Sequence, residues 1–170
     1  MTRHAFVDES FQRNYTMAAA VLPAGEVNAA RSTIRQLLRP GQKRIHFKQE
    51  SDARRSQVLD TLETLDLRAR LYVAVTPTRH ARDVCLELMI PDLAAERVRR
   101  VLLERDDSLV QADRKLLYHL TRKHAPDMEY DHMRAHEDLL LCGAAAIAWC
   151  WTRGGCWRAR VAKYCTEIRV

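Results

Sequence analysis

Two short apolar runs open the chain, and a mostly polar stretch separates them. The first covers residues 4–8 and the second residues 15–22, where Pro23 ends it. Two apolar runs joined by a polar connection predict a β-hairpin, although residues 17–21 alone also fit a helix.

Helical and strand patterns then alternate along the rest of the chain. The clearest strand covers residues 67–75, where apolar side chains occupy every second position until Pro77. Apolar residues at helical spacing predict helices elsewhere, with Ser51 as an N-cap and Gly154-Gly155 as a stop. We expect helices over 27–38, 51–65, 111–124 and 136–152, and further strands over 43–47, 98–104 and 127–133.

A further helix is expected from about Arg79. Its spacing places four residues inward and puts a proline inside the pattern, which should kink or split the helix. The inward residues are Ala81, Val84, Cys85 and Leu88, and the proline is Pro91.

A hairpin followed by alternating strands and helices predicts an α/β fold. The sheet should have mixed strand directions, with helices on its faces. The chain shows no linker, low-complexity segment or internal repeat, so residues 1–170 are expected to form one domain.

Composition excludes several classes of protein. With 47% hydrophobic and 29% charged residues, neither a disordered nor a fibrous chain is expected. The longest nearly uncharged run, residues 139–152, is shorter than the roughly 20 residues of a membrane helix. The first twenty residues carry charges and lack a signal-peptide core. The five cysteines show no CxxC spacing, which argues against a zinc ribbon or a disulfide framework. We therefore expect a cytoplasmic protein without a membrane span.

The net charge of +6 and the pI near 9.3 favour a polyanionic partner, and nucleic acid is the first to consider. Only five of the 28 basic residues are lysines; codon usage in a genome rich in G and C explains that ratio as well as phosphate binding does. Arg153, Arg158 and Arg160 surround Trp157 and form a candidate nucleic-acid-binding patch, although a solvated tail explains them equally well.

Asp8 is the most informative single residue. It follows Phe6 and Val7 at the end of a strand that should be central in the sheet. A buried carboxylate is unfavourable unless it is paired or binds a metal ion. Asp8-Glu9-Ser10 also suits the start of a turn, and the residues alone leave both interpretations open.

Several short motifs, in this order, resemble a family of uncharacterised bacterial proteins with a ribonuclease H-like fold. They are Ala5-Phe-Val-Asp8-Glu9-Ser10, the run Tyr15–Leu22, Arg44-Ile-His46-Phe47 with Glu50-Ser51-Asp52, Val101-Leu-Leu-Glu104-Arg-Asp106-Asp107, and a small-residue helix over 139–151. The resemblance spans most of the chain. It implies a five-stranded mixed sheet, with an antiparallel hairpin, parallel later strands and helices on both faces.

The resemblance also implies a nuclease that hydrolyses phosphodiester bonds of DNA or RNA with two Mg²⁺ or Mn²⁺ ions. Asp8 matches the first acid of the family and would bridge both ions, while Glu50, Glu104 and Asp107 are candidates to complete the catalytic cluster. Each has an ordinary alternative. Glu50 could pair with Arg54 four residues on, Glu-Arg-Asp-Asp could be a solvated corner, and His46 could be a strand residue rather than a ligand or proton shuttle.

One departure from the family pattern affects the metal site. Proteins of this type carry an aspartate inside the last helix, where this chain has Ala145. Asp138 lies about two helical turns earlier, and it could bind metal, alone or with His136, if it replaced that ligand. Helix capping is the alternative role for both residues. The second hypothesis is therefore a catalytically degraded module that binds nucleic acid without cutting it.

Overall fold

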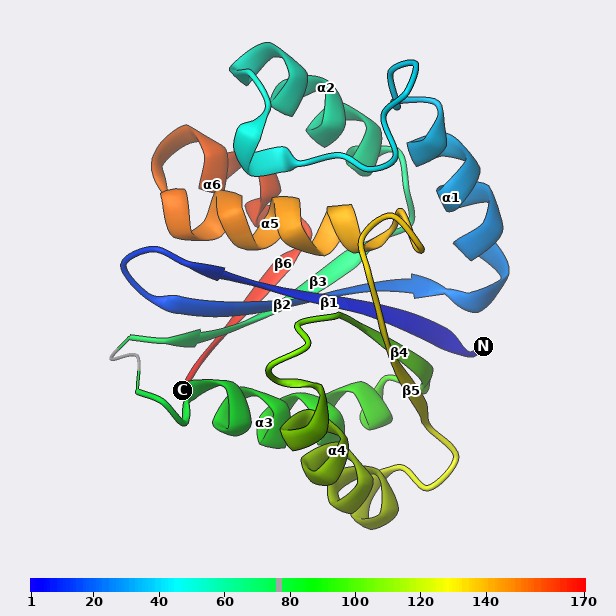
Figure 1. The fold of residues 1–170 in the computed structure, drawn as a ribbon, viewed down its shortest axis with the longest axis vertical. Coiled ribbons are helices and arrows are strands. Elements are labelled where there is room, and N and C mark those ends of the chain that lie inside the picture. The colour runs from blue at the N-terminus through cyan, green and yellow to red at the C-terminus, as the bar shows by residue number, and fades with distance from the viewer. Residues whose placement is uncertain (76–77) are drawn as a thin grey trace.

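A computed structural model describes residues 1–75 and 78–170. Its centre is a six-stranded sheet in the order β5-β4-β1-β2-β3-β6, with helices above and below it (Figure 1). The strands are β1 (Arg3–Phe11), β2 (Tyr15–Pro23), β3 (Arg68–Ala74), β4 (Val98–Glu104), β5 (Glu129–Met133) and β6 (Cys165–Arg169). The helices are α1 (Val27–Arg35), α2 (Asp52–Glu63), α3 (Ala81–Ala95), α4 (Val110–His124), α5 (Leu141–Arg153) and α6 (Gly155–Ala162), with short 3₁₀ turns η1 (Ala24–Glu26) and η2 (Phe47–Gln49).

The strand directions confirm the predicted mixed sheet. Strand β2 is antiparallel to both of its neighbours, β1 and β3. Strands β4 and β5 extend the sheet beside β1 in parallel, and β6 lies parallel to β3 at the other edge. The predicted hairpin is therefore correct, and β6 adds a sixth strand to the five expected.

The two faces of the sheet bury separate apolar cores, because side chains along a strand alternate between faces. Phe6 and Ala18 point toward the layer that contains α1, α2 and α5. Val7 and Met17 point toward α3 and α4. Since both layers cover β2, eight of its nine residues are buried.

The strand predicted over 43–47 is wrong. This segment pairs with no strand and runs through an irregular stretch into η2. Ile45 and Phe47 are buried in the core below α2 and α5, so their alternation reflects packing of a loop. In the sequence, the alternating apolar residues of this loop look the same as those of a half-buried strand.

The predicted inward face of α3 is also partly wrong. Val84 and Leu88 are exposed, whereas Leu86, Met89 and Ile90 are fully buried. The helix is apolar on more than one side, so the spacing alone fits two different stripes. Pro91 lies inside one helix and does not split it. Pro77, predicted to close the strand before this helix, lies outside the described residues.

The last long helix begins at Leu141 and not near residue 136. Asp138 Oδ1 accepts the backbone N–H of Leu140 at 3.1 Å, and Glu137 accepts that of Arg134 at 2.6 Å, so this segment forms turns ahead of α5. The predicted stop is confirmed, since Gly154 follows α5 with a φ of 76° that favours glycine. Within the described residues, no helix combines the length and apolar character needed to cross a bilayer.

Candidate functional site

Glu104 ends β4, whereas Asp8 lies inside β1, which continues to Phe11, so the prediction that Asp8 ends its strand is wrong. Val7 of β1 is paired with Leu103 of β4, and the two acids are the next residues along each strand. The carboxyl ends of parallel strands meet at one edge of a sheet, which is where ligand sites form in open α/β folds. The two acids therefore lie side by side at the point where the pairing of β1 with β4 ends.

The two carboxyl groups are within hydrogen-bonding range of each other. Burial raises the pKa of Asp8 well above its ordinary value, and the hydrogen bond and like charge of Glu104 raise it further. Asp8 Oδ1 also accepts the backbone N–H of Glu9 at 2.7 Å. Two acids in such contact repel each other when both are ionised, so the pair favours either a shared proton or a bound cation.

A cleft of about 320 Å³ opens above this pair on the α5 side. Asp8 and Glu104 line it together with Ala145 of α5. Three basic side chains of η2 and the loop before it also line the cleft, and they are Arg44, His46 and Lys48. The cleft thus combines an acidic pair with a basic rim.

Arg44 connects the rim to the acidic pair. Its Nη1 lies 3.5 Å from Glu104 Oε1, and its Nη2 lies 2.7 Å from His46 Nδ1. An arginine nitrogen can only donate, so His46 Nδ1 is the acceptor. In the neutral imidazole the proton is then on Nε2.

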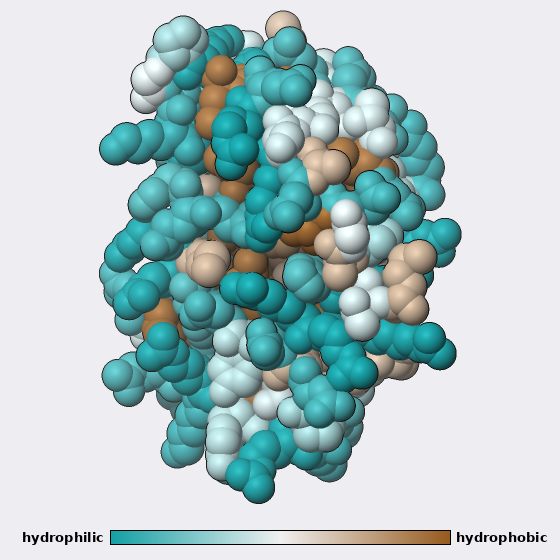
Figure 2. Space-filling model, turned by 90° about the vertical axis from the view of Figure 1, so that its right-hand side faces the viewer, coloured by the Kyte–Doolittle hydropathy of each residue, from teal (hydrophilic) through white to brown (hydrophobic). Residues whose placement is uncertain are grey.

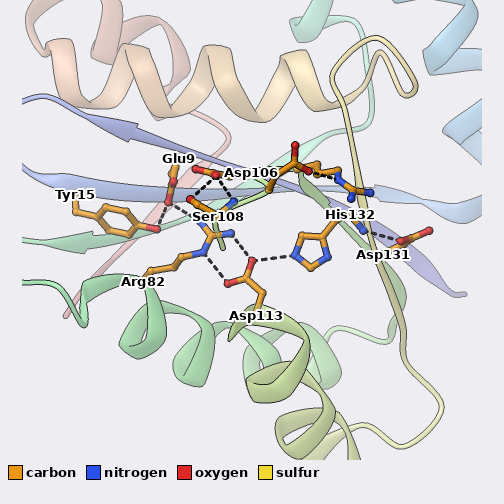
Figure 3. Close-up of polar contacts among 10 residues, drawn as sticks. Glu9, Tyr15, Arg82, Asp106, Ser108, Asp113, Asp131 and His132 are labelled. Atoms are coloured by element: carbon orange, nitrogen blue, oxygen red, sulfur yellow. Dashed lines mark hydrogen bonds and ion pairs between the residues drawn. The ribbon is translucent and has the colours of Figure 1, made fainter. Parts of the chain in front are cut away.

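A buried polar network lies beneath the tip of β1, on the opposite face of the sheet (Figure 3). Glu9 accepts hydrogen bonds from Tyr15 and from Arg82, the latter at 2.7 Å. Arg82 also binds Asp113 through two N–H groups, at 2.9 and 2.7 Å. Asp113 Oδ2 in turn lies 2.9 Å from His132 Nε2.

This network joins β1, α3, α4 and β5. The side chains of Asp113 and His132 are only 2% and 1% exposed. Burial alone would raise the pKa of Asp113, but hydrogen bonds from Arg82 and His132 outweigh it and hold the pKa below its ordinary value. Sequence reasoning missed this network. The alternation of Asp8 and Glu9 along a strand indicates that their side chains leave opposite faces of the sheet, but no pattern indicates the partners of Glu9.

Asp107 lies on the other side of the acidic pair. It does not line the α5-side cleft and lines a second hollow with Glu104 and Arg105. Arg105 and Arg134 donate to it at 2.7 and 2.9 Å, and these hydrogen bonds lower the pKa of Asp107.

Glu50 and Asp138 do not line the cleft. Glu50 accepts a hydrogen bond from Gln42 at 3.1 Å, and it forms no ion pair with Arg54. Asp138 is buried and bound by Arg31, whose Nη2 lies 2.6 Å from Oδ2.

The three arginines near the C-terminus contact groups of the protein itself. Arg158 pairs with Glu167 and stacks 4.1 Å from the centre of the Trp151 ring. Arg160 pairs with Asp60 at 2.6 Å, and Arg153 lies over Trp149.

No group of three or more His, Cys, Asp or Glu side chains in the described residues is arranged to hold a metal ion. Of the five acids that the sequence nominated, the structure brings Asp8 and Glu104 into contact.

Neither a protein-family model nor a curated protein sequence matches the chain. Solved structures do match over most of it. One comes from the complex of PCNA with RNase HII from Archaeoglobus fulgidus, with 14% identity, a TM-score of 0.56, and 94% of this chain and 74% of that chain covered. Another is ribonuclease H2 from Pyrococcus horikoshii OT3, with 14% identity, a TM-score of 0.54, and 95% and 74% covered.

The fold is ribonuclease H-like. At this level of identity the likeness establishes the architecture alone. Within the ribonuclease H-like fold of this chain, Ala145 lies on the wall of the cleft that holds Asp8 and Glu104. The position where the resemblance implies an aspartate therefore faces the acidic pair with a methyl group.

Proposed function

We propose that the protein is a nuclease that hydrolyses phosphodiester bonds in nucleic acid, with a divalent cation bound by Asp8 and Glu104. The apposition of these two carboxyl groups at the floor of a cleft carries the proposal. The ribonuclease H-like fold and the net charge of +6 support nucleic acid as the substrate.

The acidic pair fits one Mg²⁺ or Mn²⁺ ion. Mg²⁺ commonly binds through one or two carboxylates and keeps several waters for its other positions. A doubly charged ion would also relieve the repulsion within the pair. The other candidate acids, Glu50, Asp107 and Asp138, contact other groups of the protein in this structure. A bound divalent cation supplies Lewis-acid polarisation of a phosphoryl oxygen and lowers the pKa of water.

The rim residues have separate tasks in this proposal. Lys48 and the remaining donors of Arg44 bind and orient the phosphate group above the acidic pair. His46 holds a proton at Nε2, because its Nδ1 accepts from Arg44, and it can donate a hydrogen bond from Nε2 to a phosphate oxygen.

The direct test is cleavage of labelled DNA and RNA oligonucleotides with Mg²⁺ or Mn²⁺. Asp8→Asn and Glu104→Gln should each lower the rate at least about 100-fold, because each removes an ionisable ligand. Asp127→Asn is the control, since Asp127 pairs with Arg99 away from the cleft. Cleavage that survives Asp8→Asn, or that continues in excess chelator, would rule the proposal out.

A second candidate function is nucleic-acid binding without cleavage. Ala145 favours it, since α5 presents a methyl group to the cleft where the resemblance implies a carboxylate. In that case oligonucleotides would bind with strong salt dependence and no response to divalent cations, and Asp8→Asn would leave the affinity unchanged or raise it.

A further inference from the structure

The acidic pair separates two hollows. The second, of about 510 Å³, opens on the side of Arg82 and the segment that leads into α4. Asp8, Glu9 and Glu104 line both hollows, so a chain that passes over the pair can contact each of them.

Two arginines face the second hollow from neighbouring strand ends. Arg105 directly follows β4, and Arg134 directly follows the adjacent parallel strand β5. Asp107 holds both guanidinium groups in place, at 2.7 Å from Arg105 Nε and 2.9 Å from Arg134 Nη2. The two side chains are 40% and 50% exposed. Each uses one side-chain N–H on Asp107 within the described part of the chain, and its other donors are free to bind an anion.

The charges of the acidic side chains that line this hollow determine under which conditions an anion can bind in it. Glu9 is bound by Arg82, Asp107 by two arginines, and Asp106 by the backbone N–H and hydroxyl group of Ser108. Within the described residues, neither Asp8 nor Glu104 forms an ion pair with an arginine of this hollow, and Glu104 pairs with Arg44 of the first cleft. Binding of a phosphate in the second hollow should therefore need a divalent cation at the acidic pair.

We propose that the substrate is a polynucleotide chain whose backbone crosses the acidic pair, with one phosphate bound by Arg105 and Arg134 and another by Arg44 and Lys48. The inference rests on the proposed nuclease function and narrows its substrate to a chain that extends on both sides of the cleaved bond. Arginine forks suit phosphate oxygens, and such contacts position a nucleic acid without reading its sequence.

Binding provides the first test, and it does not depend on cleavage. The probe is a fluorescent 20-nucleotide single strand, as DNA and as RNA, with Ca²⁺ as the divalent cation. The double variant Arg105→Ala/Arg134→Ala should weaken binding about 10- to 100-fold and reduce the slope of log affinity against log salt by about 1. Arg99→Ala is the matched control, because Arg99 is 51% exposed and also paired with an exposed aspartate. An affinity equal to that of the control would overturn the inference.

Hydrolysis of a small diester provides the second test. Bis(p-nitrophenyl) phosphate has no backbone to reach the second hollow, so with Mn²⁺ the double variant should lose much less activity on it than on the oligonucleotide. The same variant should show a higher KM for the oligonucleotide. Equal losses on both substrates would show that the arginines position the acidic pair and do not bind the chain.

The two proposals fail in different ways. Loss of oligonucleotide affinity in the double variant, together with cleavage that ignores Asp8→Asn, would leave the binding path intact and remove the nuclease. Cleavage that requires Asp8 but is unchanged in Arg105→Ala/Arg134→Ala would support the nuclease and remove the binding path.

Discussion

Ala145 is the residue whose size most directly affects the proposed site. Its side chain ends at Cβ on the wall of the cleft that contains Asp8 and Glu104. An aspartate there would extend a carboxylate into the same space, one turn from each of Cys142 and Trp149 on the cleft side of α5. A third oxygen ligand increases the affinity of a site for a hard cation.

We therefore expect Ala145→Asp to bind Mn²⁺ at least about 10-fold more tightly than the wild type, as measured by calorimetry. The helix propensity of aspartate lowers stability by only about 0.6 kcal/mol. Without the cation, the variant should melt at a lower temperature because three acids then face one another. Ala159→Asp, at an exposed position of α6, is the control and should leave Mn²⁺ affinity unchanged. Equal affinity in the two variants would mean that residue 145 does not face the ion.

Among the elements, α3 and α4 support the end of β1 through the network of Glu9, Arg82 and Asp113. Breaking a buried ion pair from one side leaves an uncompensated charge, which typically lowers stability by about 3–5 kcal/mol. The network lies directly beneath the acidic pair, so it also fixes the backbone from which Asp8 extends.

The lowered pKa of Asp113 predicts a definite pH dependence of stability. The folded protein holds this pKa below the unfolded value of about 3.9, so the carboxylate stabilises the fold above that pH. The contribution is lost as the pH falls through the folded-state pKa. Urea unfolding between pH 3 and 7 should therefore show Asp113→Asn less stable at pH 7 and the difference shrinking toward pH 3. Asp127→Asn, on an exposed aspartate, should show no comparable difference. A constant difference across the range would contradict this role for Asp113.

Elements with a strong local signal were predicted correctly, and those fixed by distant packing were not. Alternation identified β3 and β4, and the Ser51 cap was confirmed by its hydrogen bond from the backbone N–H of Arg54. The segment 43–47 gave a strand signal, but it has no neighbour to pair with because β1 and β2 are already flanked by β4 and β3.

The same limit applies to the candidate site. Asp8 and Glu104 were expected to meet as strand ends of a parallel sheet. They lie together although β1 continues to Phe11, because each directly follows the last residue pair between β1 and β4. The partners of Glu50, Asp107 and Asp138 lie on other segments and depend on how loops fold over the sheet. Sequence spacing has no information on Arg31 and Asp138, which are separated by 107 positions yet form an ion pair.

For the whole molecule, charge is spread widely over the surface. Figure 2 shows one face on which hydrophilic residues predominate and hydrophobic ones are confined to small, separated areas. Many arginines are already paired with acids and so offer fewer free donors to a polyanion than their number suggests. Attraction of a polyanion should therefore depend on the unpaired donors and on a bound cation.

The stability of the folded protein should increase when that cation binds. A ligand that binds only the folded state stabilises it by mass action, about 2.7 kcal/mol at 100 times Kd. For a chain of this size that corresponds to a rise in Tm of about 5–10 °C with saturating Mn²⁺. Asp8→Asn should abolish most of this shift, as measured by differential scanning calorimetry. An equal shift in both proteins would place the cation elsewhere.

The two outermost strands, β5 and β6, are each five residues long and carry charged side chains, among them Glu129 and Asp131 on one and Glu167 and Arg169 on the other. Long, flat, apolar edge strands pair with strands of other molecules and start aggregation. Short charged edge strands oppose such pairing. We therefore expect this basic protein to remain free of aggregates at concentrations at which the same sheet with β3 as an exposed edge strand would form fibrils.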